Sequence, residues 1–382
     1  MCKRIHARKT ACIAYIVGFD RKVSDMSRFL VLAAGFLVLA ACTADDAPVA
    51  ARDGITRIEP PFWWAGFEHD ELQLLVQAGG IAEYTPRVHA DGVSSARVER
   101  GDSPNYLFVY LDVGGASPGA FDIVFAKGDE RIAARYELRQ RIDAHVGTYD
   151  ASDVIYLITP DRFANGDPSN DDVDGYADTA DRDDDYGRHG GDIEGVRQHL
   201  DYIADMGFTQ IWLNPVLENA MDRSSYHGYA ITDYYKVDPR FGTNESYRDF
   251  VASAREHGLG VIMDMVANHA GSNHWWMDDL PTQTWLNDPD DRAITSHART
   301  THQDPYASEY DKARHADGGF VLTMPDLNQR DPLLADYLVQ NSIWWVEYLG
   351  LSGIRQDTYP YPDKHFMAEW SRRIMQEYPG FN

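Results

Sequence analysis

Residues 350–363 read GLSGIRQDTYPYPD, so charged side chains follow an apolar stretch with no turn signal to expose them. In the extended run GIRQD, side chains alternate between two faces, which puts Arg355 and Asp357 on the same face. A guanidinium beside a carboxylate favours the ionised form of that carboxylate. An ionised, oriented carboxylate at a strand end is suited to nucleophilic attack, although a buried structural ion pair would give the same pattern.

A second group of polar residues follows another apolar run. Asp264 comes directly after the run VIM, and Asn268 and His269 follow within five residues. In barrels of parallel strands, catalytic side chains lie at the carboxyl ends of the strands and in the loops that follow them. The sequence therefore predicts that the polar groups of both runs meet at one end of a parallel sheet.

The elements that would position these groups begin at residue 153. Apolar strand patterns alternate there with helix patterns, which is typical of a parallel α/β sheet whose strands are buried on both faces. Strands are expected at residues 154–159, 209–216, 260–266 and 353–358, and helices at 195–207, 245–258, 337–350 and 363–378. The long connection 270–331 needs structure or a purpose of its own, and we expect a small inserted domain over the strand ends.

An N-terminal domain is expected at residues 55–143, where short alternating runs are separated by Gly and Asp turn signals. This spacing favours a small β-sandwich. The runs are LQLLVQ, SARVER, YLFVYLDV, FDIVFA and ARYELRQR. The aromatic cluster Phe62, Trp63 and Trp64 is expected in the core or at a domain interface, with a sugar-binding platform as the alternative.

The start of the chain carries the pattern of an export signal. Residues 1–25 lack any pattern and precede an internal Met26, so we expect them to be a spurious upstream extension. Residues 26–41 contain one Arg and a short apolar run before Cys42, which is typical of a secretory signal. Residues 42–54 would form a polar tether.

Composition limits the partners of the protein. The net charge of −25 would repel nucleic acid phosphates and anionic lipid headgroups, so neutral or cationic partners are favoured. Without the expected leader and signal, Cys42 is the single cysteine, which excludes an intramolecular disulfide and a cysteine metal site. The loop FANGDPSNDD offers hard oxygen ligands that suit calcium, with a solvated acidic loop as the alternative.

Several motifs occur together in a familiar order: GFTQIWLNPV at 207–216, DMVANH at 264–269, MPDLN at 324–328 and GIRQD at 353–357. This set resembles the α-amylase family of glycoside hydrolases (family 13). MPDLN and the opening IEPPFWWAGF before a sandwich are similar to the cyclomaltodextrinase and neopullulanase branch. The resemblance implies an immunoglobulin-like β-sandwich followed by a (β/α)8 TIM barrel with a domain inserted after its third strand.

The resemblance also implies roles for individual residues. Asp357 matches the family nucleophile and Arg355 the arginine that holds it. Tyr229, His227, Asp264, Asn268 and His269 match positions at which members of the family bind the substrate. A calcium site is implied at Asn165, Asp167, Asn170, Asp171, Gly190 and Asp192. The segment Leu39–Cys42 resembles a bacterial lipobox, which implies lipidation of Cys42, a membrane anchor and a periplasmic or outer-membrane location; an unmodified thiol is the alternative.

Retaining glycosidases need a second carboxyl group as general acid, about 5 Å from the nucleophile. In the family this is a Glu on the fifth barrel strand, and we expect the chain to stop after the fourth strand and helix, before that residue. Glu369 and Glu377 lie on the expected last helix and are poor substitutes. The expected function is hydrolysis of α-1,4-glucans such as maltodextrin, cyclodextrin or pullulan, in a fragment that is itself inactive. A transglycosylase and a noncatalytic glucan-binding lipoprotein are the alternatives, and related enzymes suggest a homodimer of the full-length protein.

Overall fold

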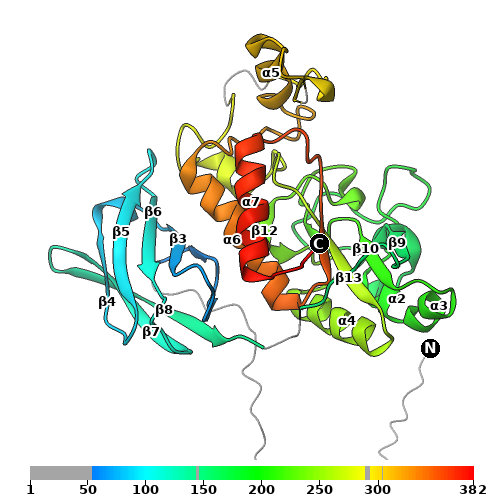
Figure 1. Ribbon diagram of the computed structural model, residues 1–382, viewed down its shortest axis with the longest axis horizontal. Coiled ribbons are helices and arrows are strands. Elements are labelled where there is room, and N and C mark those ends of the chain that lie inside the picture. Colours follow the sequence, from blue (N-terminus) through cyan, green and yellow to red (C-terminus); the bar gives the residue numbers. More distant parts are fainter. Residues whose placement is uncertain (1–53, 143–145, 289–292, 303) are drawn as a thin grey trace, which may run out of the picture. The chain divides into compact units, whose positions relative to one another are not determined.

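A computed structural model describes residues 54–142, 146–288, 293–302 and 304–382 (Figure 1). The expected leader 1–25, the signal 26–41, Cys42 and the tether up to residue 53 lie outside these residues. None of the described helices is both long enough and apolar enough to span a membrane.

The N-terminal part forms two four-stranded sheets, as the alternating runs predicted. One sheet has the order β1-β3-β6-β5 and the other β2-β8-β7-β4. The strands are β1 (Arg57–Glu59), β2 (Trp63–Ala65), β3 (Glu71–Gln77), β4 (Thr85–Val88), β5 (Ser94–Arg100), β6 (Tyr106–Asp112), β7 (Gly119–Lys127) and β8 (Glu130–Gln140), with a short 3-10 helix η1 (Ile81–Glu83). All five expected runs are strands, whereas β1, β2 and β4 are too short for an alternating pattern to reveal.

The second part is built on four parallel strands in the order β14-β13-β10-β9 (Figure 1). They are β9 (Ile155–Ile158), β10 (Gln210–Leu213), β13 (Gly260–Met265) and β14 (Gly353–Gln356), at the four expected places. The expectation that all are buried on both faces is wrong for β9, where Ile155 is 41% and Leu157 49% exposed. Ile155 and Leu157 lie on the same face of β9, so at this edge strand the described residues leave one face of the sheet uncovered.

Helices connect these strands. The longer ones are α4 (Asn244–Glu256), α6 (Pro332–Leu349) and α7 (Lys364–Glu377), and the expected helix 195–207 is divided into α2 (Ile193–Arg197) and α3 (Leu200–Asp205). Shorter elements are α1 (Pro160–Phe163), η2 (Pro168–Asn170), β11 (Leu217–Glu218), η3 (Ser225–His227) and β12 (Asp233–Val237). Asp331 caps α6 by accepting bonds from the backbone of Leu333 and Leu334, and Pro332 suits the first helical position.

The described residues of the insertion form few regular elements. Its elements are η4 (Trp275–Asp278), η5 (Arg299–His302) and α5 (Glu309–Ala316). Isolated antiparallel bridges join Leu286 to Leu327 and His269 to Asp326, so three short backbone segments lie side by side next to the end of β13. The insertion therefore reaches the backbone of the expected site residues.

The sandwich is joined to α6 by polar and aromatic contacts. Gln340 Oε1 accepts from Gln73 N and Gln340 Nε2 donates to Gln73 O, both at 2.8 Å. The side-chain amide of Gln340 thus makes the two hydrogen bonds that a neighbouring strand would make with Gln73. Trp63 and Trp64 are buried, and the Phe62 ring lies 5.1 Å from the ring of Trp344. The aromatic cluster is thus an internal interface, and the alternative of a sugar-binding platform is wrong because these faces are covered.

Candidate active site

The carboxyl ends of β13 and β14 bring three charged groups together. The register of the two strands places Asp264 opposite Arg355. Arg355 Nη1 donates to Asp264 Oδ1 at 2.9 Å and to Asp357 Oδ1 at 2.6 Å, so one guanidinium holds two carboxylates. Asp357 N donates to Met265 O at 2.7 Å, which continues the strand pairing beyond β14 and fixes the backbone of Asp357. The predicted pairing of Arg355 with Asp357 is confirmed.

Asp264 is held by neutral donors as well as by Arg355. Trp212 Nε1 donates to Asp264 Oδ2 at 2.9 Å, and the hydroxyl of Tyr229 donates to the same oxygen at 3.0 Å. Burial raises the pKa of Asp264 to about 6, although Arg355 acts in the opposite direction. The side chain therefore orients Tyr229 and Arg355 rather than facing solvent.

Tyr229 lies in a tight turn formed by the segment HGY. His227 Nδ1 accepts from Tyr229 N at 2.9 Å, and the two rings are stacked with centroids 5.8 Å apart. Gly228 has a φ of 81°, and a Cβ there would lie 1.9 Å from Pro215 O, so only glycine fits. Burial lowers the pKa of His227, which favours a neutral ring.

Asn268 and His269 lie side by side with the insertion. Leu327 N donates to Asn268 O at 2.9 Å, and His269 pairs with Asp326 through an antiparallel bridge. Burial lowers the pKa of His269 to about 4, so its imidazole is neutral at ordinary pH. Its Nε2 is buried and has no hydrogen-bond partner among the described residues, so its hydrogen-bonding capacity is unused there.

The turn after Asp357 is strained. Thr358 has a φ of 47°, which is rare for a β-branched residue and costs about 1–3 kcal/mol. Tyr361 N donates to Thr358 O at 2.8 Å, and the Tyr361 ring packs 5.0 Å from Phe320 of the insertion. Phe320 in turn lies 5.5 Å from the ring of His269, so the turn and the imidazole share one aromatic neighbour.

Sequence reasoning assigned no role to three residues of this site. Trp212 belongs to the quoted motif GFTQIWLNPV, but its bond to Asp264 depends on side chains of two neighbouring strands. Asp326 belongs to MPDLN and is buried, where desolvation raises its pKa and Asn287 Nδ2 donates to it at 2.6 Å. The conformation of Thr358 has no signal in the sequence.

The two glutamates rejected from the sequence as acids lie elsewhere. Glu369 of α7 accepts from Arg372 Nε at 2.7 Å. Glu377 accepts from the backbone N–H groups of Glu68 and His69, both at 2.9 Å. Both are engaged with partners away from Asp357, as expected.

Three of the six expected calcium ligands, Asn165, Asp171 and Gly190, lie next to one another, while Asn170 Nδ2 donates to Asp192 Oδ2 at 3.4 Å. Asn165 Nδ2 donates to Asp171 Oδ1 at 2.7 Å, and a Cβ on Gly190 would lie 2.6 Å from that oxygen and 2.9 Å from Asn165 Nδ2. The oxygens Asn165 Oδ1 and Asn170 Oδ1 are buried without a hydrogen-bond partner among the described residues. Buried, unpartnered amide oxygens in a loop that also carries a carboxylate fit a hard cation.

The other two expected ligands have other contacts. Asp167 Oδ1 accepts from Ser169 N at 3.0 Å and caps η2. Asp192 accepts from three backbone N–H groups, those of Gly166, Asp167 and Gly195, at 2.6–3.1 Å. These two side chains shape the loop in the structure, while the carboxylate of Asp171 accepts from the amide nitrogen of Asn165. Among the described residues, no group of three or more His, Cys, Asp and Glu is arranged to hold a metal, so any cation here depends on amide and carbonyl oxygens.

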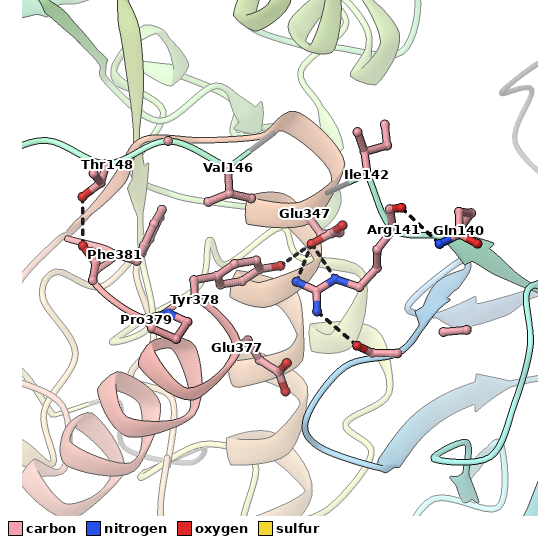
Figure 2. A pocket seen from close by; sticks show the side chains of 14 residues that line it. Gln140, Arg141, Ile142, Val146, Thr148, Glu347, Glu377, Tyr378, Pro379 and Phe381 are labelled. Carbon is pink, nitrogen blue, oxygen red and sulfur yellow. Dashed lines mark hydrogen bonds and ion pairs between the residues drawn. The ribbon is translucent and has the colours of Figure 1, made fainter. Parts of the chain in front are cut away.

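A cavity of about 560 Å³ lies at the opposite end of β14 from Asp357, beside residues 146–148 and 377–381 (Figure 2). Figure 2 shows Arg141 directed at Glu347, with Nη2 and Oε2 3.1 Å apart, while the hydroxyl of Tyr378 donates to Oε2 at 2.8 Å. Its central charges are therefore paired with each other. The cavity lies between the sandwich, α6 and α7, and Asp357 does not line it.

Comparison with known families decides the identity of the fold. The family described as Alpha amylase, catalytic domain, matches residues 157–376, more than half of the chain. The chain belongs to this α-amylase family. Residues 57–142 match the family described as Cyclomaltodextrinase, N-terminal, which places this α-amylase family member in the cyclomaltodextrinase-like branch.

Relatives of this α-amylase family member share about a third of the aligned residues. It is 34% identical to Beta/alpha-amylase of Paenibacillus polymyxa over 220 residues, which cover 57% of the chain and 17% of the relative. It is 32% identical to Neopullulanase 2 of Thermoactinomyces vulgaris over 230 residues, covering 58% and 36%. It is 30% identical to Cyclomaltodextrinase of Thermoanaerobacter pseudethanolicus over 237 residues, covering 59% and 38%. The chain spans less than two fifths of each relative.

Solved structures agree with the family. An α-amylase from Anoxybacillus has a TM-score of 0.52 and 33% identity, over 60% of this chain and 46% of that one. A cyclomaltodextrin glucanotransferase with a three-domain ABC distribution has a TM-score of 0.51 and 25% identity, over 60% and 49%. The parallel strands and helices described above are thus part of a known catalytic fold.

Because the pKa of Asp264 is raised, its titration should be visible in the NMR signal of the Trp212 indole, which donates a hydrogen bond to it. Below about pH 6, protonation weakens the acceptor at Oδ2, so the indole N–H of Trp212 should shift upfield in ¹⁵N NMR with a midpoint near 6. Trp212→Phe assigns the signal, and Asp264→Asn should abolish the titration. The indole of Trp344, which donates to Phe62 O, serves as a control that does not titrate. A Trp212 midpoint near 4 would contradict the effect of burial.

Proposed function

We propose that the protein is a retaining glycoside hydrolase of α-1,4-linked glucans with Asp357 as its nucleophile. The observation that carries the proposal is the pair of bonds from Arg355 to Asp264 and Asp357 at two strand ends. Arg355 orients the carboxylate of Asp357 through one oxygen, while the other oxygen remains available for attack. The family match and the names of the relatives support this reaction class.

The proposed reaction has two displacements. In the first, an oxygen of Asp357 forms a bond to the anomeric carbon of the sugar, and the bond from that carbon to the leaving oxygen breaks. A proton donor must protonate the leaving oxygen. In the second, water attacks the anomeric carbon and gives a proton to the conjugate base of that donor, while the bond from the carbon to Asp357 breaks, so that the configuration is retained. The described residues supply the nucleophile and the groups that hold it.

The same residues suggest how the sugar is bound. The half-buried ring of Tyr229 offers a flat apolar face for a pyranose, and its hydroxyl is fixed by Asp264. The neutral imidazole of His269, whose Nε2 has no partner in the described part of the chain, can hydrogen-bond a sugar hydroxyl. Asn268 fixes the backbone beside it. A net charge of −25 suits an uncharged glucan better than a phosphorylated ligand.

Two alternatives use the same scaffold. A transglycosylase would pass the sugar from Asp357 to another sugar hydroxyl instead of water. A noncatalytic binding protein would keep the sugar contacts without turnover. The strained turn at Thr358 favours an enzyme, because backbone strain is usually stored where geometry serves a reaction.

We further propose that β9, β10, β13 and β14 correspond to the first four strands of a (β/α)8 barrel, with the segment between β13 and α6 as its inserted domain. Their parallel order and the likeness to the Anoxybacillus α-amylase support this assignment. On this assignment Asp264 and Asp357 lie at the catalytic end of the barrel.

The nucleophile can be tested without a proton donor. Fluoride leaves as an anion and needs little protonation, so 5-fluoro-α-D-glucosyl fluoride should label Asp357 covalently. Mass spectrometry of the digested protein should find the glycosyl ester on the peptide that contains Asp357. Asp357→Asn should lose at least about 99% of the labelling, because a nucleophile typically contributes several orders of magnitude.

The matched control for this experiment is Glu369→Gln, which removes an exposed carboxylate of α7 and should label at the wild-type rate. Labelling of another carboxylate in the wild-type protein would overturn the assignment of Asp357. Binding of maltoheptaose by wild-type protein that is never labelled would favour the noncatalytic alternative.

We also propose that calcium binds among Asn165, Asn170, Asp171 and Gly190, with Asp167 and Asp192 shaping the loop. The support is that the amide oxygens of Asn165 and Asn170 are buried and unpartnered among the described residues, and that the amide of Asn165 contacts the carboxylate of Asp171. Calcium would contribute charge and rigidity to the loop after β9 and needs no direct role in the reaction.

Calcium should therefore stabilise the protein, by about 2.7 kcal/mol at a hundredfold excess over its dissociation constant. Thermal unfolding with calcium, and with a chelator, measures this effect. Gly190→Ala should abolish the response, because the Cβ would enter the cradle. Gly175→Ala is the matched control, since Gly175 also has a positive φ, but a Cβ there would have no described atom within 4 Å. Equal calcium responses in both variants would exclude the site.

Finally, we propose that the protein is exported and anchored through a lipid on Cys42. The support is the lipobox-like segment Leu39–Cys42, which lies outside the described residues. Mass spectrometry of the N-terminal peptide from the native host should show a diacylglyceryl group on Cys42 and no residues before it. An N-terminus with an unmodified Cys42 would exclude the anchor.

A further inference from the structure

The turn between β5 and β6 of the sandwich is hydrogen-bonded to one segment of the insertion. The two facing segments, residues 101–105 and 279–283, are called the clamp below. Asp102 N donates to Pro281 O at 3.0 Å, and Gln283 N donates back to Asp102 Oδ2 at 2.7 Å. The two segments are thus joined in both directions.

Asp279 anchors the other side of the clamp. Its Oδ2 accepts from Ser103 Oγ and from Asn105 Nδ2, both at 2.9 Å. Its backbone oxygen accepts from the hydroxyl of Tyr106 at 2.8 Å. Three donors from the sandwich therefore converge on one residue of the insertion.

The clamp also explains why residue 101 is a glycine. A Cβ on Gly101 would lie 1.9 Å from Pro281 O, so the two backbones approach too closely for any side chain. The φ of Gly101 lies outside the left-handed range, so the close approach, and not the backbone conformation, requires glycine here. Substitution at this position would push the two segments apart without removing any polar group.

A series of backbone hydrogen bonds connects the insertion beside the clamp to Asn268 and His269, the proposed sugar-binding residues. Asn328 N donates to Trp285 O at 3.0 Å, and Asn287 N donates to Asp326 O at 3.2 Å. Leu327 N then donates to Asn268 O at 2.9 Å, next to His269. Three backbone segments are thus paired in sequence, from the insertion beside the clamp to the end of β13.

Side-chain contacts hold the same segments together. Phe108 of β6 lies 5.9 Å from the ring of Trp285, and Tyr106 is stacked on Trp275 at 6.2 Å. The hydroxyls of Thr282 and Thr284 both donate to Asp331 Oδ2 at 2.7 Å. The clamped segment is therefore fixed to the start of α6 as well as to the sandwich.

We propose that the clamp makes the sandwich a positioning element for the active site, with Gly101 and Asp279 as positioning residues. By fixing residues 279–287, the clamp fixes residues 326–328 and so the place of Asn268 and His269. This inference rests on the proposed function only for its kinetic test. It assigns the sandwich a role within its own chain, in addition to any role in binding or assembly.

The test compares matched variants of the full chain. Gly101→Ala opens the clamp, while Gly119→Ala in β7 adds the same methyl group where no described atom lies within 4 Å. Asp279→Ala removes the acceptor of two sandwich donors, while Asp279→Asn keeps an oxygen that can accept both. Ser103→Ala removes one of the two side-chain donors to Asp279, together with the acceptor of Asn105 N, and serves as the test if the other variants do not fold.

The kinetic readout is the labelling of Asp357 by 5-fluoro-α-D-glucosyl fluoride, expressed per folded molecule. Gly101→Ala and Asp279→Ala should lower the maximal labelling rate about tenfold or more, because small displacements in an active site cost this much. Asp279→Asn and Gly119→Ala should stay within about twofold of the wild type. Equal rates in Gly101→Ala and Gly119→Ala, or an Asp279→Asn variant as slow as Asp279→Ala, would overturn the proposal.

A second readout does not depend on activity. Amide hydrogen exchange at Leu327 and Asn287 should accelerate several-fold in Gly101→Ala and Asp279→Ala, and remain unchanged in Gly119→Ala. If the wild-type protein is not labelled, the proposed function fails, and exchange alone decides on the clamp. Unchanged exchange at both amides in folded Gly101→Ala would refute the coupling even if the enzyme is active.

Discussion

One guanidinium shared by two carboxylates governs the arrangement of the catalytic region. Arg355 is bonded to Asp264 across the strand pair and to Asp357 two residues further along the chain. Two negative charges near one positive charge are tolerable in a buried place only if further donors assist. Trp212 and Tyr229 supply these donors to Asp264, which leaves Arg355 able to serve Asp357. The positions of Tyr229 and Asp357 both depend on this shared set of donors.

Local patterns in the sequence were sufficient for those parts of the site that a single strand determines. The alternation in GIRQD placed Arg355 beside Asp357 correctly, because the period of a strand is a property of the backbone itself. The bond from Trp212 to Asp264 could not be predicted, since it depends on the register between strands. The same holds for Asp326, whose neighbours come from distant segments, and for the exposure of β9, which depends on which strands surround it.

Buried polar atoms that lack partners in the described part of the chain occur at both places where ligands are proposed, and also at other places in the core. Such atoms cost stability, so native proteins retain few of them. Here they include His269 Nε2 near the nucleophile and the amide oxygens of Asn165 and Asn170 in the loop after β9. From the sequence, Asp167 and Asp192 have the same status as Asn165, because residue type alone does not show which oxygens are already used by backbone N–H groups. Only the hydrogen bonds of the folded loop separate the two groups.

The reciprocal pair formed by Gln73 and Gln340 has a consequence for the behaviour of the sandwich as a surface. β1 covers β3 only opposite Leu75–Gln77, so the remaining edge of β3 would expose backbone donors and acceptors. The side-chain amide of Gln340 occupies both backbone groups of Gln73 on that edge. A strand from another molecule would find these two groups already taken, so a helix of the same chain protects the edge against intermolecular β-sheet growth.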